Sequence, residues 1–174
     1  IYLYDETEIT TYIREIKEQR LIVGLLYIDN YEEALETIDE VRRSLLIALV
    51  DRKINKFMQN IDAIVKKLEK DKYIILFRQE YLPQLQSNKF NILDEVRSVN
   101  AGNDIAVTIS IGLGISEESY NKGYEYARAA IDLALGRGGD QAVIKEREKI
   151  SYYGGKNIQI EKNTRVKARV KAHA

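Results

Sequence analysis

The chemistry open to this chain is limited first by the nucleophiles and metal ligands that it lacks. Its 174 residues include no cysteine, so disulfides, thiolate zinc sites and cysteine nucleophiles are excluded. The one histidine is His173, next to the last residue, so no histidine-based acid, base or metal cluster can form inside the fold. Many enzyme classes are thereby excluded.

The charged residues are balanced overall but not along the chain. Lys and Arg number 27, and Asp and Glu also number 27, which removes the general electrostatic case for nucleic-acid binding. The tail over 161–174 carries a net charge of +4, so the remaining residues carry −4. Such a tail could bind phosphate, but a solvated basic connector is the commoner use of this composition. We expect no nucleic-acid partner.

From the sequence we expect neither a membrane segment nor a signal peptide in this chain. The longest purely apolar run, Leu45–Val50, is far below the roughly 20 residues that cross a bilayer. The first residues lack both the basic and the apolar part of a signal peptide, and there is no initiator Met. We therefore expect an excised fragment that makes no membrane contact of its own.

The apolar spacing predicts the elements that would hold a site in place. The apolar run over 21–28 is typical of a strand buried on both faces, and Asp29-Asn30 ends it and can cap a helix. The runs 63–69 and 72–77 flank a polar turn, which predicts a β-hairpin. Helices are predicted over 9–19, 31–39, 40–61, 79–100 and 120–135, and further strands over 106–115, 142–144 and 150–153. Alternating helices and strands imply a sheet with helices packed on it.

This order of elements, together with two short motifs, resembles the GGDEF fold of diguanylate cyclases. In that family a strand ends in D-x-D-x-F-K, and here the matching residues are Tyr27-Ile28-Asp29-Asn30-Tyr31-Glu32. The family's hairpin turn reads R-x-G-G-D-E-F, and here it reads Lys67-Leu68-Glu69-Lys70-Asp71-Lys72-Tyr73. The resemblance covers about residues 20–153. It implies an α/β (α+β) fold in which a ferredoxin-like mixed sheet is flanked by helices.

The departures from these motifs bear on the chemistry. The two metal-binding carboxylates of a working cyclase are replaced by Tyr27 and Lys72, neither of which can replace a hard oxygen anion for Mg²⁺. The other replaced positions are the two turn glycines, now Glu69 and Lys70, and the two guanine-reading residues, now Leu35 and Ser44. We therefore expect no diguanylate cyclase activity.

A second glycine pair, in Arg137-Gly138-Gly139-Asp140, is superficially like the GGDEF signature. It follows a predicted helix, and Gln141-Ala142 stands in place of Glu-Phe. A glycine C-cap with a tight turn into the next strand is the expected structure here.

The chain also resembles, more narrowly, the membrane-bound cyclic-di-AMP phosphodiesterases of Gram-positive bacteria, which have a PAS, a degenerate GGDEF and a DHH/DHHA1 region. The segments that carry this resemblance are 1–8 (the end of a PAS domain), 133–141 with 152–156 (the GGDEF end) and 161–170 (the entry into the DHH module). The resemblance implies a PAS end and connector helix over 1–19, a degenerate GGDEF-like domain over 20–155 and a basic connector over 156–174.

The same resemblance places phosphodiester hydrolysis outside this chain, in a DHH module that binds Mn²⁺. No Asp-His-His triplet occurs in the sequence. It implies a regulatory domain without a cofactor of its own, in contact with the neighbouring PAS and DHH domains and with a second copy in a homodimer. It also implies a cytoplasmic domain of a bacterial cell-membrane protein.

Asp29 and Asp71 are the acids that remain at motif positions. They could hold a Mg²⁺-bridged triphosphate, with Lys70 and Lys72 near the phosphates, and the family's degenerate domain is associated with weak ATP hydrolysis. The same aspartates have common structural uses, Asp29 as a helix cap and Asp71 in a hairpin turn, and a charged hairpin tip is usually solvated. Nucleotide binding and a plain protein-interaction domain thus both stay open.

Overall fold

The computed structural model describes residues 6–155. The predictions for residues 1–5, at the end of a PAS domain, and for the basic connector over 156–174 lie outside the described residues. Along the described part of the chain, no helix has the length and apolar character needed to cross a membrane.

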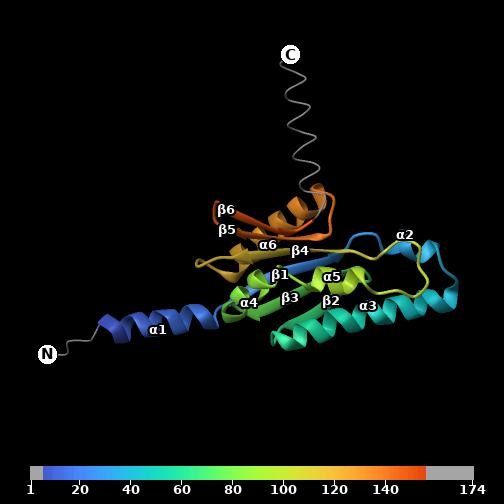
Figure 1. Ribbon diagram of the computed structural model, residues 1–174. Coiled ribbons are helices and arrows are strands. Elements are labelled where there is room, and N and C mark those ends of the chain that lie inside the picture. The colour runs from blue at the N-terminus through green and yellow to red at the C-terminus, as the bar shows by residue number, and fades with distance from the viewer. Residues whose placement is uncertain (1–5, 156–174) are drawn as a thin grey trace, which may run out of the picture.

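A six-stranded mixed sheet forms the centre of the molecule, in the order β2-β3-β1-β4-β5-β6 (Figure 1). All neighbouring strands are antiparallel except β4 and β5, which are parallel. The strands are β1 (Leu21–Ile28), β2 (Ile64–Glu69), β3 (Lys72–Arg78), β4 (Ile109–Ile115), β5 (Gln141–Glu146) and β6 (Lys149–Gly154). The expected mixed sheet flanked by helices is confirmed.

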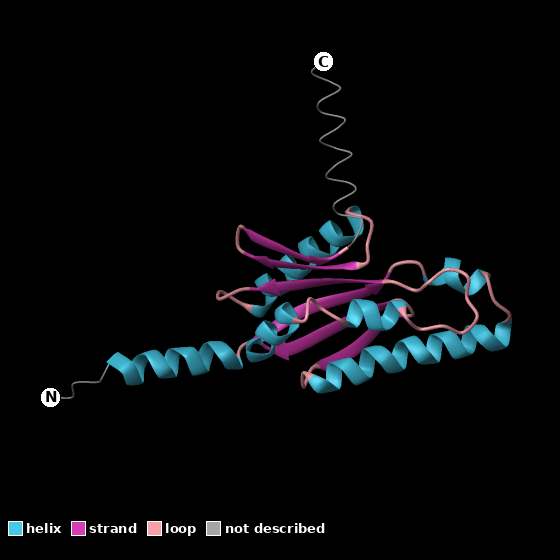
Figure 2. Ribbon diagram, viewed as in Figure 1, coloured by secondary structure: helices cyan, strands magenta, loops and turns pink. Residues whose placement is uncertain are grey.

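The helices are distributed over both faces of this sheet (Figure 2). They are α1 (Glu6–Gln19), α2 (Tyr31–Glu36), α3 (Glu40–Asn60), the 3₁₀ helix η1 (Gln79–Tyr81), α4 (Leu82–Ser87), α5 (Ile92–Arg97) and α6 (Tyr120–Gly136). The larger core cluster joins α3, α4 and α5 to one face, and α6 covers β4, β1 and β5 on the other. Helix α1 extends away from the sheet (Figure 1).

Strand β1 is buried on both faces, as its nearly unbroken apolar run predicted, and it lies in the middle of the sheet. It pairs with β3 on one side and β4 on the other, and six of its eight residues are buried. The residue that follows β1 therefore emerges between two other strands, so its side chain can contact segments that are distant in sequence.

Glycines let α6 approach the sheet closely. A Cβ atom at Gly114 would lie 1.8 Å from the carbonyl oxygen of Gly123, and a Cβ at Gly112 would lie 2.4 Å from the backbone nitrogen of Ile131. Small residues also form the face of α6 that meets the sheet, where Ala127, Ala130 and Ala134 are buried against β1, β4 and β5. The close packing leaves no space for side chains at these strand positions.

The single helix predicted over 79–100 is wrong. The chain instead forms η1, α4 and α5, because the backbone turns at Lys89 and Phe90, which both have positive φ angles. The turn places the Phe90 ring in the core, where its centroid lies 5.2 Å from that of Tyr153. Apolar periodicity cannot distinguish this turn from a continuous helix, because Phe90 is buried in either arrangement.

Candidate functional site

The two positions that carry metal-binding carboxylates in cyclases lie next to each other at the end of β1. Tyr27 and Lys72 are register partners on β1 and β3. The Lys72 ammonium lies 5.2 Å from the centroid of the Tyr27 ring, and it also lies 3.4 Å from Glu69. Burial raises the pKa of the Tyr27 hydroxyl, although Lys72 opposes this shift. A neutral ring and a cation thus lie side by side at the two positions matched to the cyclase motifs.

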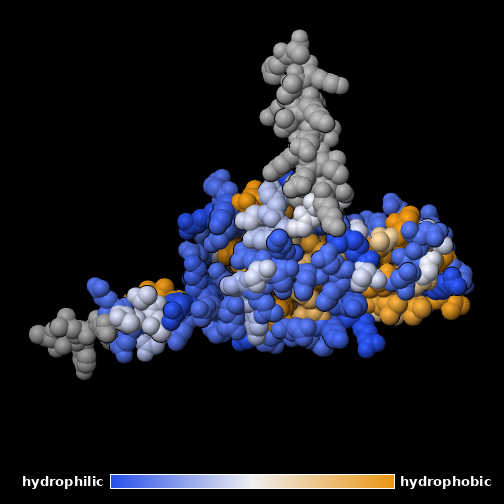
Figure 3. Space-filling view, in the orientation of Figure 1, coloured by the Kyte–Doolittle hydropathy of each residue, from blue (hydrophilic) through white to orange (hydrophobic). Residues whose placement is uncertain are grey.

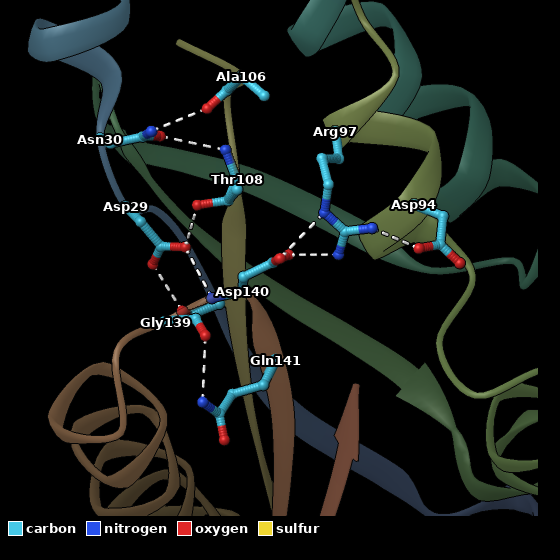
Figure 4. A network of polar contacts seen from close by, with 10 residues as sticks. Asp29, Asn30, Asp94, Arg97, Ala106, Thr108, Gly139, Asp140 and Gln141 are labelled. Carbon is cyan, nitrogen blue, oxygen red and sulfur yellow. Dashed lines mark hydrogen bonds and ion pairs between the residues drawn. The ribbon is translucent and has the colours of Figure 1, made fainter. Parts of the chain in front are cut away.

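Asp29 follows β1, and its carboxylate is used within the protein (Figure 4). Its Oδ1 accepts a hydrogen bond of 2.6 Å from Ser110 Oγ, and its Oδ2 accepts one of 2.8 Å from Thr108 Oγ1. Oδ2 also accepts a 2.9 Å hydrogen bond from the backbone N–H of Asp140. A Cβ atom at Gly139 would lie 2.8 Å from the Asp29 carboxylate, so glycine is needed for this approach. Asp29 therefore joins β1, β4 and the turn after α6.

The interpretation of Asp29 as a helix cap is wrong. The N-cap of α2 is Asn30, whose side chain makes no capping bond. Asn30 instead donates a 2.8 Å hydrogen bond to the Ala106 carbonyl and accepts one of 3.1 Å from Thr108 N–H. The Asn30 side chain thus takes the backbone hydrogen bonds of 106–108 that a neighbouring strand would otherwise take. For this reason β4 begins at Ile109 and not at Ala106, where the sequence predicted its start.

The network continues from Asp140 to α5 (Figure 4). Arg97 donates two hydrogen bonds to the Asp140 carboxylate, of 3.0 Å from Nε and 2.7 Å from Nη2, and its Nη1 binds Asp94. Burial raises the pKa of the Asp140 carboxyl above its ordinary value, even though Arg97 opposes the shift. The bidentate pair thus compensates for a carboxylate that the fold has partly removed from water.

The segment 137–140 forms the expected turn, and its last residue also takes part in the polar network around Asp29. Gly138 and Gly139 have φ angles of +100° and +74°, and Gly139 N–H donates to the Ala134 carbonyl, as expected of a glycine C-cap. The last residue of the segment, Asp140, joins the network with Asp29 and Arg97, which sequence reasoning missed. Asp29 and Asp140 are 111 residues apart, so no local pattern could show the contact.

Removing Arg97 tests how the Asp140 charge is held. We expect Arg97→Ala to lower the free energy of unfolding by about 2–3 kcal/mol, because a half-buried carboxylate loses its bidentate partner. In that background Asp140→Asn should restore about 1 kcal/mol, since it removes the uncompensated charge. Urea unfolding of the two single variants and the double variant measures this. A double variant that shows the full sum of the two single losses would contradict the coupling.

Asp71 lies in the β2–β3 turn, as predicted. Its carbonyl accepts a 2.8 Å hydrogen bond from Ile28 N–H, which fixes the turn beside the end of β1. Within residues 6–155, its carboxylate has no hydrogen bond or salt bridge. The neighbouring Lys70 forms an exposed ion pair of 2.5 Å with Glu32 on α2. The structure thus brings Asp29 and Asp71 to the same end of β1, and of the two carboxylates only that of Asp71 has no hydrogen bond or salt bridge within residues 6–155.

The two residues matched to the guanine-reading positions of cyclases, Leu35 and Ser44, make only local contacts within the domain. Leu35 is half-buried against the core, and its carbonyl accepts a 2.8 Å hydrogen bond from Arg43 Nε. Arg43 Nε also lies 3.1 Å from the Ile38 carbonyl, so its guanidinium links α2 to the start of α3. Ser44 is exposed and bonds weakly back to Glu40 on its own helix. Neither position presents an amide or carboxylate to a base.

A divalent cation does not fit these residues. Across the described residues, no group of three or more His, Asp or Glu side chains is placed to hold a metal ion. Oxygen-rich ligation of Mg²⁺ requires several carboxylate, carbonyl or water oxygens in near-octahedral geometry. Tyr27 and Lys72 supply none of these anions, and the Asp29 carboxylate already accepts three hydrogen bonds.

Comparisons with known proteins agree with this fold. The GGDEF domain of DgcB from Caulobacter crescentus, solved in complex with c-di-GMP, matches with a TM-score of 0.60 and 19% identity, over 79% of this chain and 84% of that chain. Cyclic-di-AMP phosphodiesterase GdpP of Geobacillus thermodenitrificans is 37% identical over 100% of this chain and 27% of its own length. A membrane protein–large ribosomal subunit bL9 fusion protein of Aster yellows witches'-broom phytoplasma is 31% identical over 98% of this chain and 20% of its own length.

The chain therefore spans only about a quarter of the length of the phosphodiesterase from Geobacillus thermodenitrificans. The model of one family, described as the GGDEF domain of GdpP-like cyclic-di-AMP phosphodiesterases, matches residues 26–152. This range contains the end of β1, the hairpin, α6 and the Asp29 network. The chain belongs to the family of GGDEF domains found in GdpP-like cyclic-di-AMP phosphodiesterases.

Proposed function

We propose that this domain is a regulatory GGDEF-type module that has lost diguanylate cyclase chemistry and serves a longer cyclic-di-AMP phosphodiesterase. The observation that carries the proposal is the Tyr27–Lys72 pair, in which a ring and an ammonium replace the two carboxylates of the cyclase metal site. Phosphoryl transfer depends on metal ions to neutralise charge on the reacting oxygens. Without them the domain retains the cyclase fold and lacks the means to join two nucleotides.

Hydrolysis in the parent protein belongs, in this proposal, to a DHH module with Mn²⁺ outside the chain. The sequence has no Asp-His-His triplet and no histidine before residue 173, so it cannot supply that metal site itself. The domain would lie on the cytoplasmic side of the cell membrane, between PAS and DHH regions of the same chain. Its function would be to transmit a signal from one to the other.

The loss of cyclase activity has a direct test. We expect the purified chain, incubated with GTP and Mg²⁺, to form no cyclic-di-GMP above the level of a reaction without protein, as followed by chromatography. An active GGDEF domain under the same conditions is the positive control. Robust product formation would overturn the proposal.

In the full-length parent, deletion of residues 20–155 should leave Mn²⁺-dependent hydrolysis of cyclic-di-AMP in place. Complete loss of hydrolysis while the DHH module stays folded would contradict the assignment of hydrolysis to that module.

Nucleotide binding or weak ATP hydrolysis is the second candidate, and it is favoured by the Asp71 carboxylate, which has no hydrogen bond or salt bridge in the described part of the chain. Asp71 lies between Lys70 and Lys72, whose ammonium groups would have to exchange their ion pairs with Glu32 and Glu69 for contacts with phosphates. In this proposal Asp71 is the residue to test, because Asp29 is committed to the network. Asp71→Ala should then reduce ATP turnover at least ten-fold without changing the thermal midpoint. Unchanged turnover would assign the activity to a contaminant.

A further inference from the structure

The exposed side of helix α3 carries a row of apolar side chains. Val41, Leu45 and Ala48 are separated by four and then three residues, so they follow one another along the same side of the helix. All three are exposed, Val41 to 81% and Leu45 to 49%. The space-filling view shows apolar surface at the end of the molecule where α3 begins (Figure 3). The opposite side of α3 enters the core through Leu46, Val50, Ile54, Phe57 and Met58.

Basic side chains continue this row towards the C-terminal end of α3. Arg52 and Lys56 stand at its next two positions, and Lys53 lies beside them. All three are exposed, and within residues 6–155 none of them forms an ion pair or a side-chain hydrogen bond. Arg42, in contrast, lies 3.9 Å from Asp39. The second half of the row therefore presents three cations that the described part of the domain does not neutralise.

The positive charge of α3 is a local excess. The helix contains five basic and two acidic residues, whereas the chain before the tail over 161–174 carries −4 in total. Of the two acids, Glu40 is the first residue of the helix, and Asp51 accepts a 2.8 Å hydrogen bond from the Tyr73 hydroxyl of β3. Neither acid belongs to the exposed row.

An anionic lipid surface matches both halves of this row. Apolar side chains beside Lys and Arg are typical of helices that lie in the plane of a bilayer interface, where apolar groups enter the headgroup boundary and cations meet lipid phosphates. The row is convex and follows one helix of 21 residues, about 30 Å in length. Mobile headgroups can meet the cations anywhere along it, whereas an acidic protein needs carboxylates at matching points of a concave surface.

We propose that α3 binds the surface of an anionic bilayer, with Val41 and Leu45 in the headgroup boundary and Arg52, Lys53 and Lys56 against lipid phosphates. The domain would then lie on the membrane along the side that α3 occupies in Figure 1. The apolar runs of the sequence bear on crossing a bilayer, which is a different requirement from binding its surface. A lipid ligand goes beyond the loss of cyclase chemistry, because the position of the domain would depend on the charge of the leaflet.

Co-sedimentation of the 174-residue chain with vesicles tests the charges. At about 0.1 M salt, we expect at least ten-fold stronger binding to vesicles of phosphatidylglycerol and phosphatidylcholine in equal parts than to phosphatidylcholine alone. Equal binding to the two kinds of vesicle, or no binding to either, would contradict the proposal.

Two triple variants remove the same charge from different surfaces. Arg52→Gln/Lys53→Gln/Lys56→Gln should weaken binding to the anionic vesicles at least ten-fold. Arg14→Gln/Lys17→Gln/Lys149→Gln, at other exposed positions, should change it less than about two-fold. Similar losses in the two variants would show a general charge effect and refute the site. The basic tail is present in both, so binding that survives the α3 substitution would belong to the tail and would also refute it.

Because the chain has no tryptophan, one introduced Trp reports the apolar contact. Val41→Trp should show a blue-shifted emission on the anionic vesicles and quenching by lipids brominated in the acyl chain. Ile64→Trp, on β2 at a position that is 64% exposed, should show neither change. Equal shifts and quenching at the two positions would mean that the domain does not bind through α3.

Polyglutamate in solution separates a lipid site from a site for an acidic protein. Val41→Gln/Leu45→Gln leaves the charge unchanged and should weaken vesicle binding at least five-fold, while Ile64→Gln/Leu68→Gln should leave it unchanged. If the chain binds polyglutamate as tightly as vesicles, and Val41→Gln/Leu45→Gln weakens neither, then α3 is a site for an acidic protein and the lipid proposal is wrong. All the substituted positions are exposed, and circular dichroism verifies that each variant is folded.

Discussion

Asp29→Ala is expected to lower the free energy of unfolding by about 3–5 kcal/mol. The change removes an acceptor for the Ser110 and Thr108 hydroxyls and for the Asp140 N–H. Ser110 is fully buried, so its hydroxyl loses a partner that water cannot replace. Each hydrogen bond to a charged group contributes about 1.5–3 kcal/mol, and unsatisfied buried donors add to the loss.

Denaturant unfolding followed by circular dichroism measures this effect, and Asp71→Ala is the matched control. Asp71 lies in the β2–β3 turn beside the same end of β1, but within residues 6–155 its carboxylate has no hydrogen bond or salt bridge, so we expect a change below about 0.5 kcal/mol. Equal destabilisation by the two variants would contradict the assigned role of Asp29. The comparison also affects activity assays, since loss of ATP turnover in Asp29→Ala would report unfolding rather than a lost metal ligand.

Gly114→Ala is expected to destabilise the domain by about 3 kcal/mol or more. The added Cβ atom would lie 1.8 Å from the Gly123 carbonyl oxygen and 2.5 Å from the Ala127 nitrogen, both backbone atoms of α6. A helix cannot yield locally as a flexible side chain can, so α6 must move away from β4 as a body. Overpacking of this kind costs about 1–3 kcal/mol where side chains can adjust, and more where backbone must move.

Thermal and urea unfolding measure this change, and Gly136→Ala in α6 is the control. A Cβ atom at Gly136 meets nothing within 4 Å, so that variant should be neutral or stabilising by up to about 1 kcal/mol through helix propensity. The two variants make the same chemical change in elements that pack together. A Gly114→Ala protein as stable as the parent would show that α6 is not held at the distance described.

Sequence reasoning predicted the elements well where the signal is local and continuous. The run over 21–28 is β1, and the polar turn at Lys70-Asp71 joins β2 to β3. Tyr27 and Lys72 were matched to the cyclase motifs from sequence, and the structure places them as register partners. Motif positions on two paired strands can be transferred from sequence because strand pairing fixes their register.

Long-range contacts explain the failures. Asp29 follows a strand and precedes a helix, which is the local pattern of a cap, yet its partners lie 79, 81 and 111 residues away. Asp140 ends a glycine turn that local rules describe correctly, but its contacts with Arg97 depend on how α5 packs against the sheet. Polar side chains at strand ends are positioned by topology, which a single sequence does not encode locally.

The central position of β1 also has a consequence for synthesis on the ribosome. Residues 21–28 are among the first of the domain to emerge, but their sheet partners end at Arg78 and Ile115. The Asp29 carboxylate finds its last donor only when Asp140 is available. At about 5–20 residues per second, the nascent chain therefore carries β1 without its β4 partner until Ile115 has been added. Folding completes only as the segment that leads out of the domain begins to emerge, so one edge of this apolar strand stays unpaired until late in the synthesis of the domain.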